Sequence, residues 1–228
     1  MTSTTTETNE RSAARRRVPR QARSRARVEA VLDAAAALVV EHGVEALTTR
    51  AIADAAGVPV ASLYQYFADK EDVLLALADR DMAEMDEQVL SDLATLPVLT
   101  VASVVETTMR AFVTVYHRRP AFVEIWLRGR TNTALHDYGR EHNRRIAATL
   151  RALALETGLA DEGLAEHVAL LAVEVGDRCF QLAFEHDAQG DPALVEEGIA
   201  LVTAYLERHA TPAGRTGVPQ PGSGEGRP

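Results

Sequence analysis

The run of residues 47–77, LTTRAIADAAGVPVASLYQYFADKEDVLLAL, is the part of this chain that most constrains its fold. It predicts a short helix, a turn at Gly57, a second short helix and the start of a third. Thr48 is placed to cap the first helix, because its hydroxyl can accept a bond from a backbone N–H of the first turn. Gly57 suits a helix end that needs a positive φ, and Pro59 fixes φ at the entry to the next helix. This layout is typical of a helix-turn-helix, which places its second helix in a DNA groove.

The predicted second helix, residues 60–67, has an inner and an outer side. Leu63 and Phe67 are spaced i, i+4, so both can pack inward. On the outer side Gln65 can pair with adenine, and the methyl groups of a valine or an alanine can touch a thymine methyl. Hydroxyl and ammonium groups hold phosphate oxygens and set the register on DNA. The residues that carry such groups here are Thr49, Tyr64, Tyr66 and Lys70.

The pieces LTTRAIADAAGV and SLYQYFADKEDVL resemble the N-terminal domain of TetR/AcrR-type transcriptional regulators, and the resemblance covers about residues 24–92. It implies an all-helical dimer that binds DNA through its N-terminal domain and a ligand through its C-terminal domain. By this resemblance Tyr64, Tyr66, Lys70 and Thr49 are phosphate contacts, and Arg50, Ala61, Ser62 and Gln65 are base-side contacts. Thr48 and Val60 complete the predicted DNA-contact set. Pro59 departs from the family pattern, because many relatives carry there a serine that caps the recognition helix.

We therefore predict an all-α fold, with a three-helix N-terminal DNA-binding domain and a helical C-terminal domain for ligand binding and dimerisation. The predicted segments are a disordered basic arm (1–23), the helix-turn-helix domain (24–69), the ligand-binding and dimerisation domain (70–210) and a disordered tail rich in Gly and Pro (211–228). Helices are expected at about residues 24–42, 70–93, 97–118, from 120 to 156 with an interruption near 131–133, 162–186 and 192–209.

The charge of the chain is unevenly distributed. The net charge of −9 argues against uniform attraction to nucleic acid, yet residues 1–70 hold ten basic and eight acidic residues, against fourteen and twenty-five in 71–228. The basic excess thus coincides with the predicted DNA-binding domain. Eight arginines fall between residues 11 and 27 with no acid among them. This arm either follows phosphates or enters a minor groove, or it remains a solvated tail.

The last two predicted helices are the most apolar part of the second domain, and the first of them, residues 162–186, is apolar on two sides and therefore needs two partners. One partner is its own domain. The second, by resemblance to the family, is the same helix pair of another copy, in a homodimer that matches a palindromic operator. The residues predicted at this interface are Leu171, Val175, Cys179, Leu182, Ile199, Val202 and Leu206. The alternative is a thick monomer core.

Regulators of this family usually bind a small molecule in the second domain, and an apolar or amphipathic ligand is predicted here. The candidate ligand-contact residues are Met109, Phe112, Tyr116, Phe122, Trp126, Arg128, Glu174, Arg178 and Phe180. Trp126 and Tyr116 are the strongest candidates among the aromatic residues. Asp177 is another charged residue near this apolar set. Glu174 and Arg178 are spaced i, i+4, so an internal ion pair would satisfy both without any ligand.

Several other functions find no support in the sequence. The seven histidines form no cluster, so no metal site and no cofactor are expected. Cys179, the single cysteine, lies in an apolar stripe and is interpreted as a small buried hydrophobic residue. No secretory signal or membrane-spanning run is found, so a cytoplasmic protein is predicted. Enzyme motifs are missing, and the main alternative to a ligand-released repressor is a DNA-binding regulator without a small-molecule ligand, controlled by a protein partner.

Overall fold

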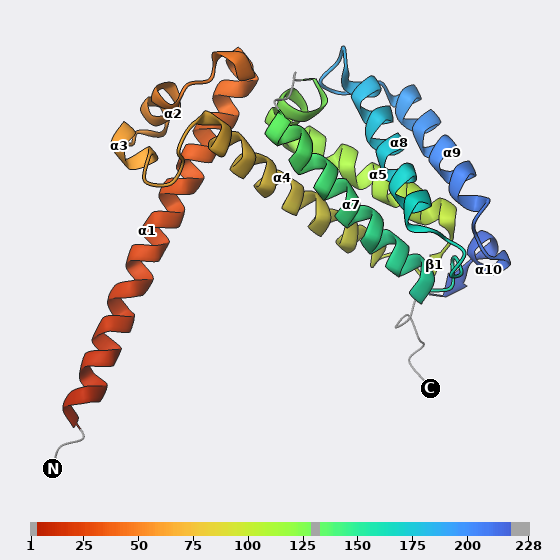
Figure 1. Cartoon of the computed structure of the whole chain (residues 1–228), viewed down its shortest axis with the longest axis horizontal. Coiled ribbons are helices and arrows are strands. Elements are labelled where there is room, and N and C mark those ends of the chain that lie inside the picture. Colours follow the sequence, from red (N-terminus) through yellow and green to blue (C-terminus); the bar gives the residue numbers. More distant parts are fainter. Residues whose placement is uncertain (1–3, 129–132, 220–228) are drawn as a thin grey trace. The chain divides into compact units, whose positions relative to one another are not determined.

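The computed structural model describes the backbone of residues 4–128 and 133–219 and the side chains of residues 22–128 and 135–217. The chain divides into two compact units, Met1–Leu77 and Ala78–Pro228, and is helical almost throughout (Figure 1). The boundary falls inside helix α4 (Lys70–Leu93) rather than before it, at 69/70, as the sequence suggested. The first turns of α4 belong to the first unit because Val73, Leu74 and Leu77 are buried.

The first unit contains α1 (Thr4–His42), a 3₁₀ turn η1 (Val44–Ala46), α2 (Thr49–Ala56), α3 (Val60–Leu63) and the start of α4. Helix α1 begins at Thr4, so the backbone of residues 4–23 is helical where a disordered arm was expected. Six arginines and three alanines among these twenty residues are strong helix formers and favour the longer helix. Residues 1–3 and the arginine side chains before Ala22 lie outside the described part of the chain.

The local signals around the turn act as the sequence indicated. The N–H of Ala51 donates to Thr48 Oγ1 over 3.1 Å, which confirms the N-cap of α2. Gly57 ends α2 with φ 65° in the left-handed region, where a side chain would be strained. Leu63 and Phe67 are both buried, as predicted. The regular α-helix α3 ends at Leu63, however, and residues 64–66 continue as a turn.

The second unit contains the rest of α4 and a set of helices with one small sheet. Its elements are β1 (Val98–Leu99), α5 (Val101–Arg118), α6 (Pro120–Phe122), a π-helical turn η2 (Val123–Leu127), α7 (Thr133–Glu156), α8 (Glu166–Phe184), α9 (Pro192–Glu207), α10 (Pro212–Thr216) and β2 (Val218–Pro219). Helix α8 packs against α7 and α9, and α9 also packs against α5. The interruption expected near residues 131–133 lies largely outside the described residues.

Two boundaries in this unit differ from the prediction. Helix α5 begins at Val101 instead of Pro97, because Thr100 and Ser103 form a reciprocal capping box. The tail is ordered as far as residue 219: Thr211 donates to the Gly158 carbonyl oxygen, and β2 pairs with β1 in antiparallel register. These contacts supply the order that Gly and Pro content alone did not indicate. Residues 220–228 lie outside the described range.

An aromatic cluster forms the centre of the second unit. Tyr116 is buried, stacks on Phe122 with ring centroids 5.8 Å apart, and meets Phe180 and Phe184 edge-on, each at 5.3 Å. This cluster joins α5, α6 and α8 into one core. In the part of the chain that the structure describes, no helix is long and apolar enough to cross a membrane.

Candidate DNA interface and ligand cavity

Two hydroxyl groups predicted to contact phosphate lie together on the helix-turn-helix. Thr49 Oγ1 at the start of α2 and the Tyr64 phenol oxygen after α3 are 3.1 Å apart and share a hydrogen bond. The side chain of Tyr64 is nevertheless 54% exposed. A large aromatic side chain that stays in solvent with its hydroxyl held in place is well suited to hold a phosphate oxygen.

Tyr66 has a more structural position than Tyr64. The hydroxyl of Ser24 in α1 donates to the Tyr66 phenol oxygen over 3.1 Å, and Tyr66 is half-buried. This bond fixes the end of the recognition segment to the first helix. Ser24 could not be recognised from the sequence, because a serine within a helix gives no local signal of a distant partner.

The other predicted DNA contacts differ in exposure. Arg50, Ala61 and Gln65 are exposed, whereas Val60, Ser62 and Lys70 are half-buried. Thr48 is exposed, but its hydroxyl already caps α2. Among the described residues neither Arg50 nor Lys70 forms an ion pair, so both cations are available to phosphates or bases. The contacts with DNA themselves stay predictions.

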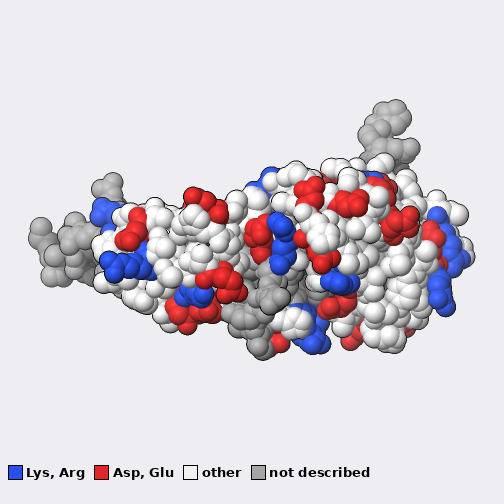
Figure 2. All heavy atoms as spheres, turned by 90° about the horizontal axis from the view of Figure 1, so that it is seen from above, with Lys and Arg blue, Asp and Glu red and all other residues white. Residues whose placement is uncertain are grey.

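Figure 2 shows acidic and basic side chains interspersed over one face of the molecule, without a wide field of one sign. Residues 1–70 likewise carry ten basic against eight acidic residues, so their net charge is small.

A cavity of about 120 Å³ lies in the second unit between α5, α7, α8 and α9. Met109, Phe112 and Phe180 line it, as the sequence analysis expected of a ligand site. An apolar cavity of about 150 Å³ can hold a molecule of the size of benzene. This cavity is therefore the strongest candidate ligand site in the described part of the chain.

The other residues predicted to touch a ligand lie elsewhere. Tyr116 and Phe122 fill the aromatic core instead, because their rings pack against each other. Arg128 forms an i, i+4 ion pair with Glu124. Glu174 does not line the cavity, and neither does Arg178, which donates to Gln181 Oε1 over 3.0 Å. The internal ion pair expected between Glu174 and Arg178 is not formed, since the guanidinium of Arg178 donates to Gln181 instead.

Trp126 also misses the cavity, but it contacts one of the residues that line it. Its ring occupies the space beside Gly139, where an added Cβ would lie 1.7 Å from a ring atom. Its side chain bonds to the carboxylate of Asp177, which also accepts a 2.9 Å bond from Gln181 Nε2. Burial, followed by the nearby charge of Glu174, raises the pKa of Asp177 to about 6.

The cavity holds polar groups that the sequence analysis did not assign to a ligand site. These are Thr108, Asn143, Arg151 and His209, which line it together with Asp177. Thr108 is 7% exposed, and its hydroxyl has no hydrogen-bond partner among the described residues. The signal that would have found it is its i, i+4 spacing from Val104 and Phe112, which also line the cavity.

The predicted dimer face is divided between solvent and core. Leu171 and Leu182 of α8 are 48% and 41% exposed, as an interface would require. Val175 and Cys179 are half-buried. The remaining three, Ile199, Val202 and Leu206, pack against the unit's own core. On α9 the exposed apolar residues are instead Leu194 and Leu201, at 40% and 54%.

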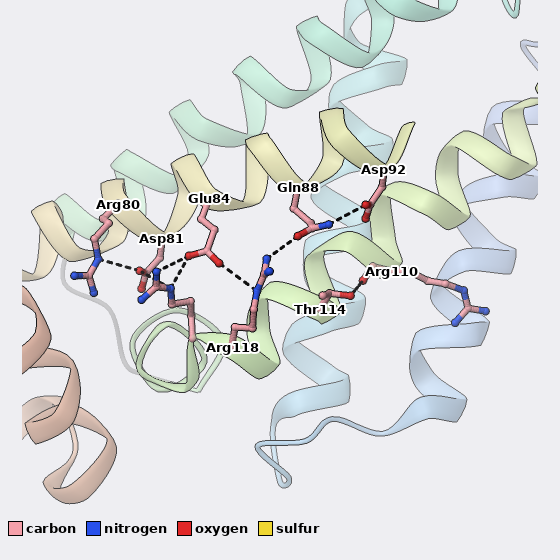
Figure 3. Close-up of polar contacts among 9 residues, drawn as sticks. Arg80, Asp81, Glu84, Gln88, Asp92, Arg110, Thr114 and Arg118 are labelled. Carbon is pink, nitrogen blue, oxygen red and sulfur yellow. Dashed lines mark hydrogen bonds and ion pairs between the residues drawn. The ribbon is translucent and has the colours of Figure 1, made fainter. Parts of the chain in front are cut away.

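A polar network joins α4 to the end of α5 (Figure 3). Glu84 of α4 binds both Arg118 and Arg119, at 3.2 Å and 2.6 Å. Arg118 also donates to Gln88 over 2.7 Å. Asp81, only 1% exposed, lies 3.6 Å from Arg119. The same helix α5 contributes residues to the cavity, so it links the cavity wall to α4.

The ion pairs of this network compensate only part of the free-energy cost of burying the Asp81 carboxylate. Its carboxylate also lies 3.4 Å from Arg80 Nε. Burial raises the pKa of Asp81 above its ordinary value, although Arg80 and Arg119 both lower it. Because the charge of this buried carboxylate is only partly compensated, the contact between α4 and α5 is sensitive to changes at Asp81.

Comparison with known proteins gives the same family for both units. Residues 31–77 match the family model of bacterial regulatory proteins, tetR family, and residues 99–210 match the Tetracyclin repressor-like C-terminal domain. The HTH-type transcriptional repressor AcnR of Corynebacterium glutamicum is 39% identical over 59 residues, which is 26% of this chain and 31% of AcnR. KstR of Mycobacterium tuberculosis, also an HTH-type transcriptional repressor, is 39% identical over 62 residues, 27% of this chain and 28% of KstR. These matches span less than a third of either relative's length.

Solved structures extend the similarity to most of the chain. A TetR-family transcriptional regulator from Streptomyces coelicolor is 32% identical with a TM-score of 0.66, and the match covers 80% of this chain and 99% of that one. FadR from Bacillus subtilis, solved in complex with stearoyl-CoA, is 21% identical with a TM-score of 0.59, over 78% of this chain and 98% of that one. The second similarity concerns the fold alone.

Proposed function

Because the chain belongs to the TetR family of bacterial regulatory proteins, we propose that it is a DNA-binding transcriptional repressor that a small molecule releases from its operator. The observation that carries this proposal is the helix-turn-helix on which the exposed Tyr64 is held by Thr49. The regulators and repressors that the chain matches are transcription factors rather than enzymes.

At the operator, each hydroxyl and cation on this face has a distinct task. Tyr64 and Thr49 hold one phosphate, and Lys70 holds another at the start of α4. Exposed Gln65 and Arg50 reach base edges, where bidentate bonds to adenine and guanine give sequence preference. Small Ala61 lets the recognition segment approach the groove.

The repressor acts as a homodimer on a palindromic operator. Support comes from the exposed leucines of α8 and α9, which are spaced by three turns and by two turns and therefore repeat on one side of each helix. Apolar residues of this size rarely remain in water along two adjacent helices. Two copies related by a two-fold axis would cover them and present two recognition segments to half-sites about one DNA turn apart.

Release by a ligand begins at the cavity. A molecule that enters between α5, α7, α8 and α9 changes the packing of α5, whose last residues hold Glu84 of α4. Helix α4 starts in the DNA-binding unit. A change at the end of α5 is therefore passed to α4, and through α4 to the residues that bind the operator. The ligand acts only by binding one arrangement of α4 better than the other.

The cavity favours this proposal over a regulator that responds to a protein partner alone. A partner-controlled regulator needs no internal space, whereas this unit retains an apolar cavity with an unpartnered hydroxyl. The neighbour solved with stearoyl-CoA supports only the point that this fold can accommodate a small molecule.

Selection of bound sequences from random duplex DNA, with the full-length protein, tests the function directly. The expected result is an enriched palindrome with half-sites about 10 bp apart. The double substitution Tyr64→Ala, Lys70→Ala should abolish enrichment, while Arg178→Ala, which removes an exposed cation of α8, should not. Binding without an enriched site, which fades with salt alone, would contradict the proposal.

A further inference from the structure

The charged group that stands out in the cavity is a carboxylate. Asp177 lines the cavity from α8, among side chains that are mostly apolar. It receives hydrogen bonds from the neutral donors Gln181 and Trp126, but it forms no ion pair with any described residue. Arg178, next to it in the chain, donates to the far side of Gln181 instead. The negative charge of Asp177 is therefore incompletely compensated by the surrounding protein groups.

The charged groups near Asp177 do not supply the missing positive charge. Glu174 lies one turn earlier on α8 and raises the pKa of Asp177 further. The cation that lines the cavity, Arg151, is engaged with the Leu164 carbonyl oxygen, to which its Nε donates over 2.7 Å. An anionic ligand would meet repulsion from Asp177, although Arg151 keeps N–H donors besides the one bonded to Leu164.

A second polar group points to a ligand independently. Threonine hydroxyls within helices commonly bond to the carbonyl four residues earlier. Thr114 does so with Arg110, and Thr157 does so with Leu153. The hydroxyl of Thr108 makes no such bond, although its side chain is 7% exposed and lines the cavity. A buried hydroxyl left without a partner costs free energy unless a ligand supplies one.

We infer that the cavity binds a lipophilic amine, whose apolar body lies among Met109, Phe112 and Phe180 and whose protonated nitrogen donates to the carboxylate of Asp177. This inference rests on the proposed function and names the chemical class of its ligand. A protonated amine supplies both the missing positive charge and several N–H donors, and charge-assisted bonds of this kind are about twice as strong as neutral ones. The low polarity of the surroundings increases the attraction further.

Titration calorimetry with the full-length protein at pH 7.5 tests the inference. The probes are n-pentylamine, 1-pentanol and sodium pentanoate, which are close to benzene in size, share one chain length and differ in the charge of the head group. Pentylamine should bind at least about tenfold more tightly than either of the others, the equivalent of about 1.4 kcal/mol. Preference for pentanoate, equal binding of all three, or no binding of any probe would overturn the inference.

Three substitutions test whether the carboxylate of Asp177 is the group that binds the amine. Asp177→Asn should weaken pentylamine binding about tenfold or more while leaving pentanol binding within about threefold, which also shows that the cavity remains intact. Thr108→Val keeps the shape but removes the hydroxyl, and should weaken pentylamine binding by about threefold to tenfold. Glu174→Gln is the matched control, because it removes a carboxylate one turn away that does not line the cavity. An equal loss in Glu174→Gln and Asp177→Asn would contradict a direct contact.

Operator binding is measured alongside, so that the two proposals can fail separately. A protein that selects a palindrome but binds no amine would overturn the inference and leave the repressor function standing. A protein that binds pentylamine through Asp177 but selects no DNA sequence would overturn the repressor function and leave the ligand class standing.

Discussion

Thr49 and Tyr64 are fifteen positions apart in the chain, yet their hydroxyl oxygens lie 3.1 Å apart across the turn of the helix-turn-helix. The bond positions an exposed phenol at the N-terminus of α2, where the unpaired backbone N–H groups of a helix favour an anion. We propose that the two hydroxyl groups bind one phosphate together, with Thr49 at the start of α2 and Tyr64 in the turn after α3.

Tyr64→Phe should lower operator affinity about fivefold to tenfold, because it removes one hydroxyl from a charge-assisted bond to phosphate. Its effect on the melting temperature should be small, since the side chain is exposed. Tyr66→Phe is the matched comparison: it breaks the bond from Ser24 and should cost about 1 kcal/mol of stability. Fluorescence anisotropy on the selected operator and thermal unfolding separate the two. Equal affinities for wild type and Tyr64→Phe would refute the contact.

Lys70→Gln should weaken binding to specific and random duplexes to a similar extent, because a phosphate contact carries no sequence information. The slope of log affinity against log salt should fall in magnitude by about 0.9 per half-site. Titrations at four salt concentrations measure this slope. An unchanged slope would show that Lys70 does not reach the DNA.

Leu201→Glu should shift the protein from dimer to monomer, because it places a charge on the outer side of α9 where 54% of the leucine is exposed. Leu90→Glu on α4 is the control, since that leucine is 59% exposed but does not belong to the α8–α9 surface. Sedimentation velocity at micromolar concentration measures both. If both variants keep the wild-type mass, the dimer uses a different surface.

Glu84→Gln should destabilise the second unit by about 1–2 kcal/mol, because it removes the ion pairs with Arg118 and Arg119 that connect α4 to α5. Glu106→Gln makes the same charge change at an exposed pair with Arg110 on α5, and should cost less than about 0.5 kcal/mol. Thermal unfolding gives the difference, and hydrogen exchange should show faster opening of α4 in Glu84→Gln alone. Identical behaviour of the two variants would argue against the connection.

Asp177→Asn should stabilise the ligand-free protein at pH 7.5. The folded-state pKa of Asp177, about 6, lies above the ordinary value of 3.8, so the folded protein holds this proton more tightly than the unfolded chain. The wild type therefore loses stability as the pH rises from about 4 to 6, and one pKa unit corresponds to about 1.4 kcal/mol. The advantage of the variant should be full at pH 7.5 and should disappear near pH 4. A constant difference in melting temperature across this range would exclude titration of Asp177 as its cause.

Much of the helix-turn-helix was predictable because its determinants are local. The cap at Thr48 acts on a backbone N–H three residues away, and the turn at Gly57 depends on the φ of a single residue. Leu63 and Phe67 face inward because of helical spacing, even though the regular helix ends earlier than predicted. Spacing could not show that Tyr66 is tied to Ser24, because those residues meet only when α1 packs on the turn.

The sequence alone determined the helical class of the chain, the position of its helix-turn-helix and the apolar character of its last two helices. Which of those apolar residues remain in water, and which aromatic residues surround a cavity, was decided only by tertiary packing. Tyr116 and Trp126 were equally plausible as ligand contacts, but one completes an aromatic core and the other lies against Gly139. A cavity is the space that side chains from four helices leave unfilled, so no single helix encodes it.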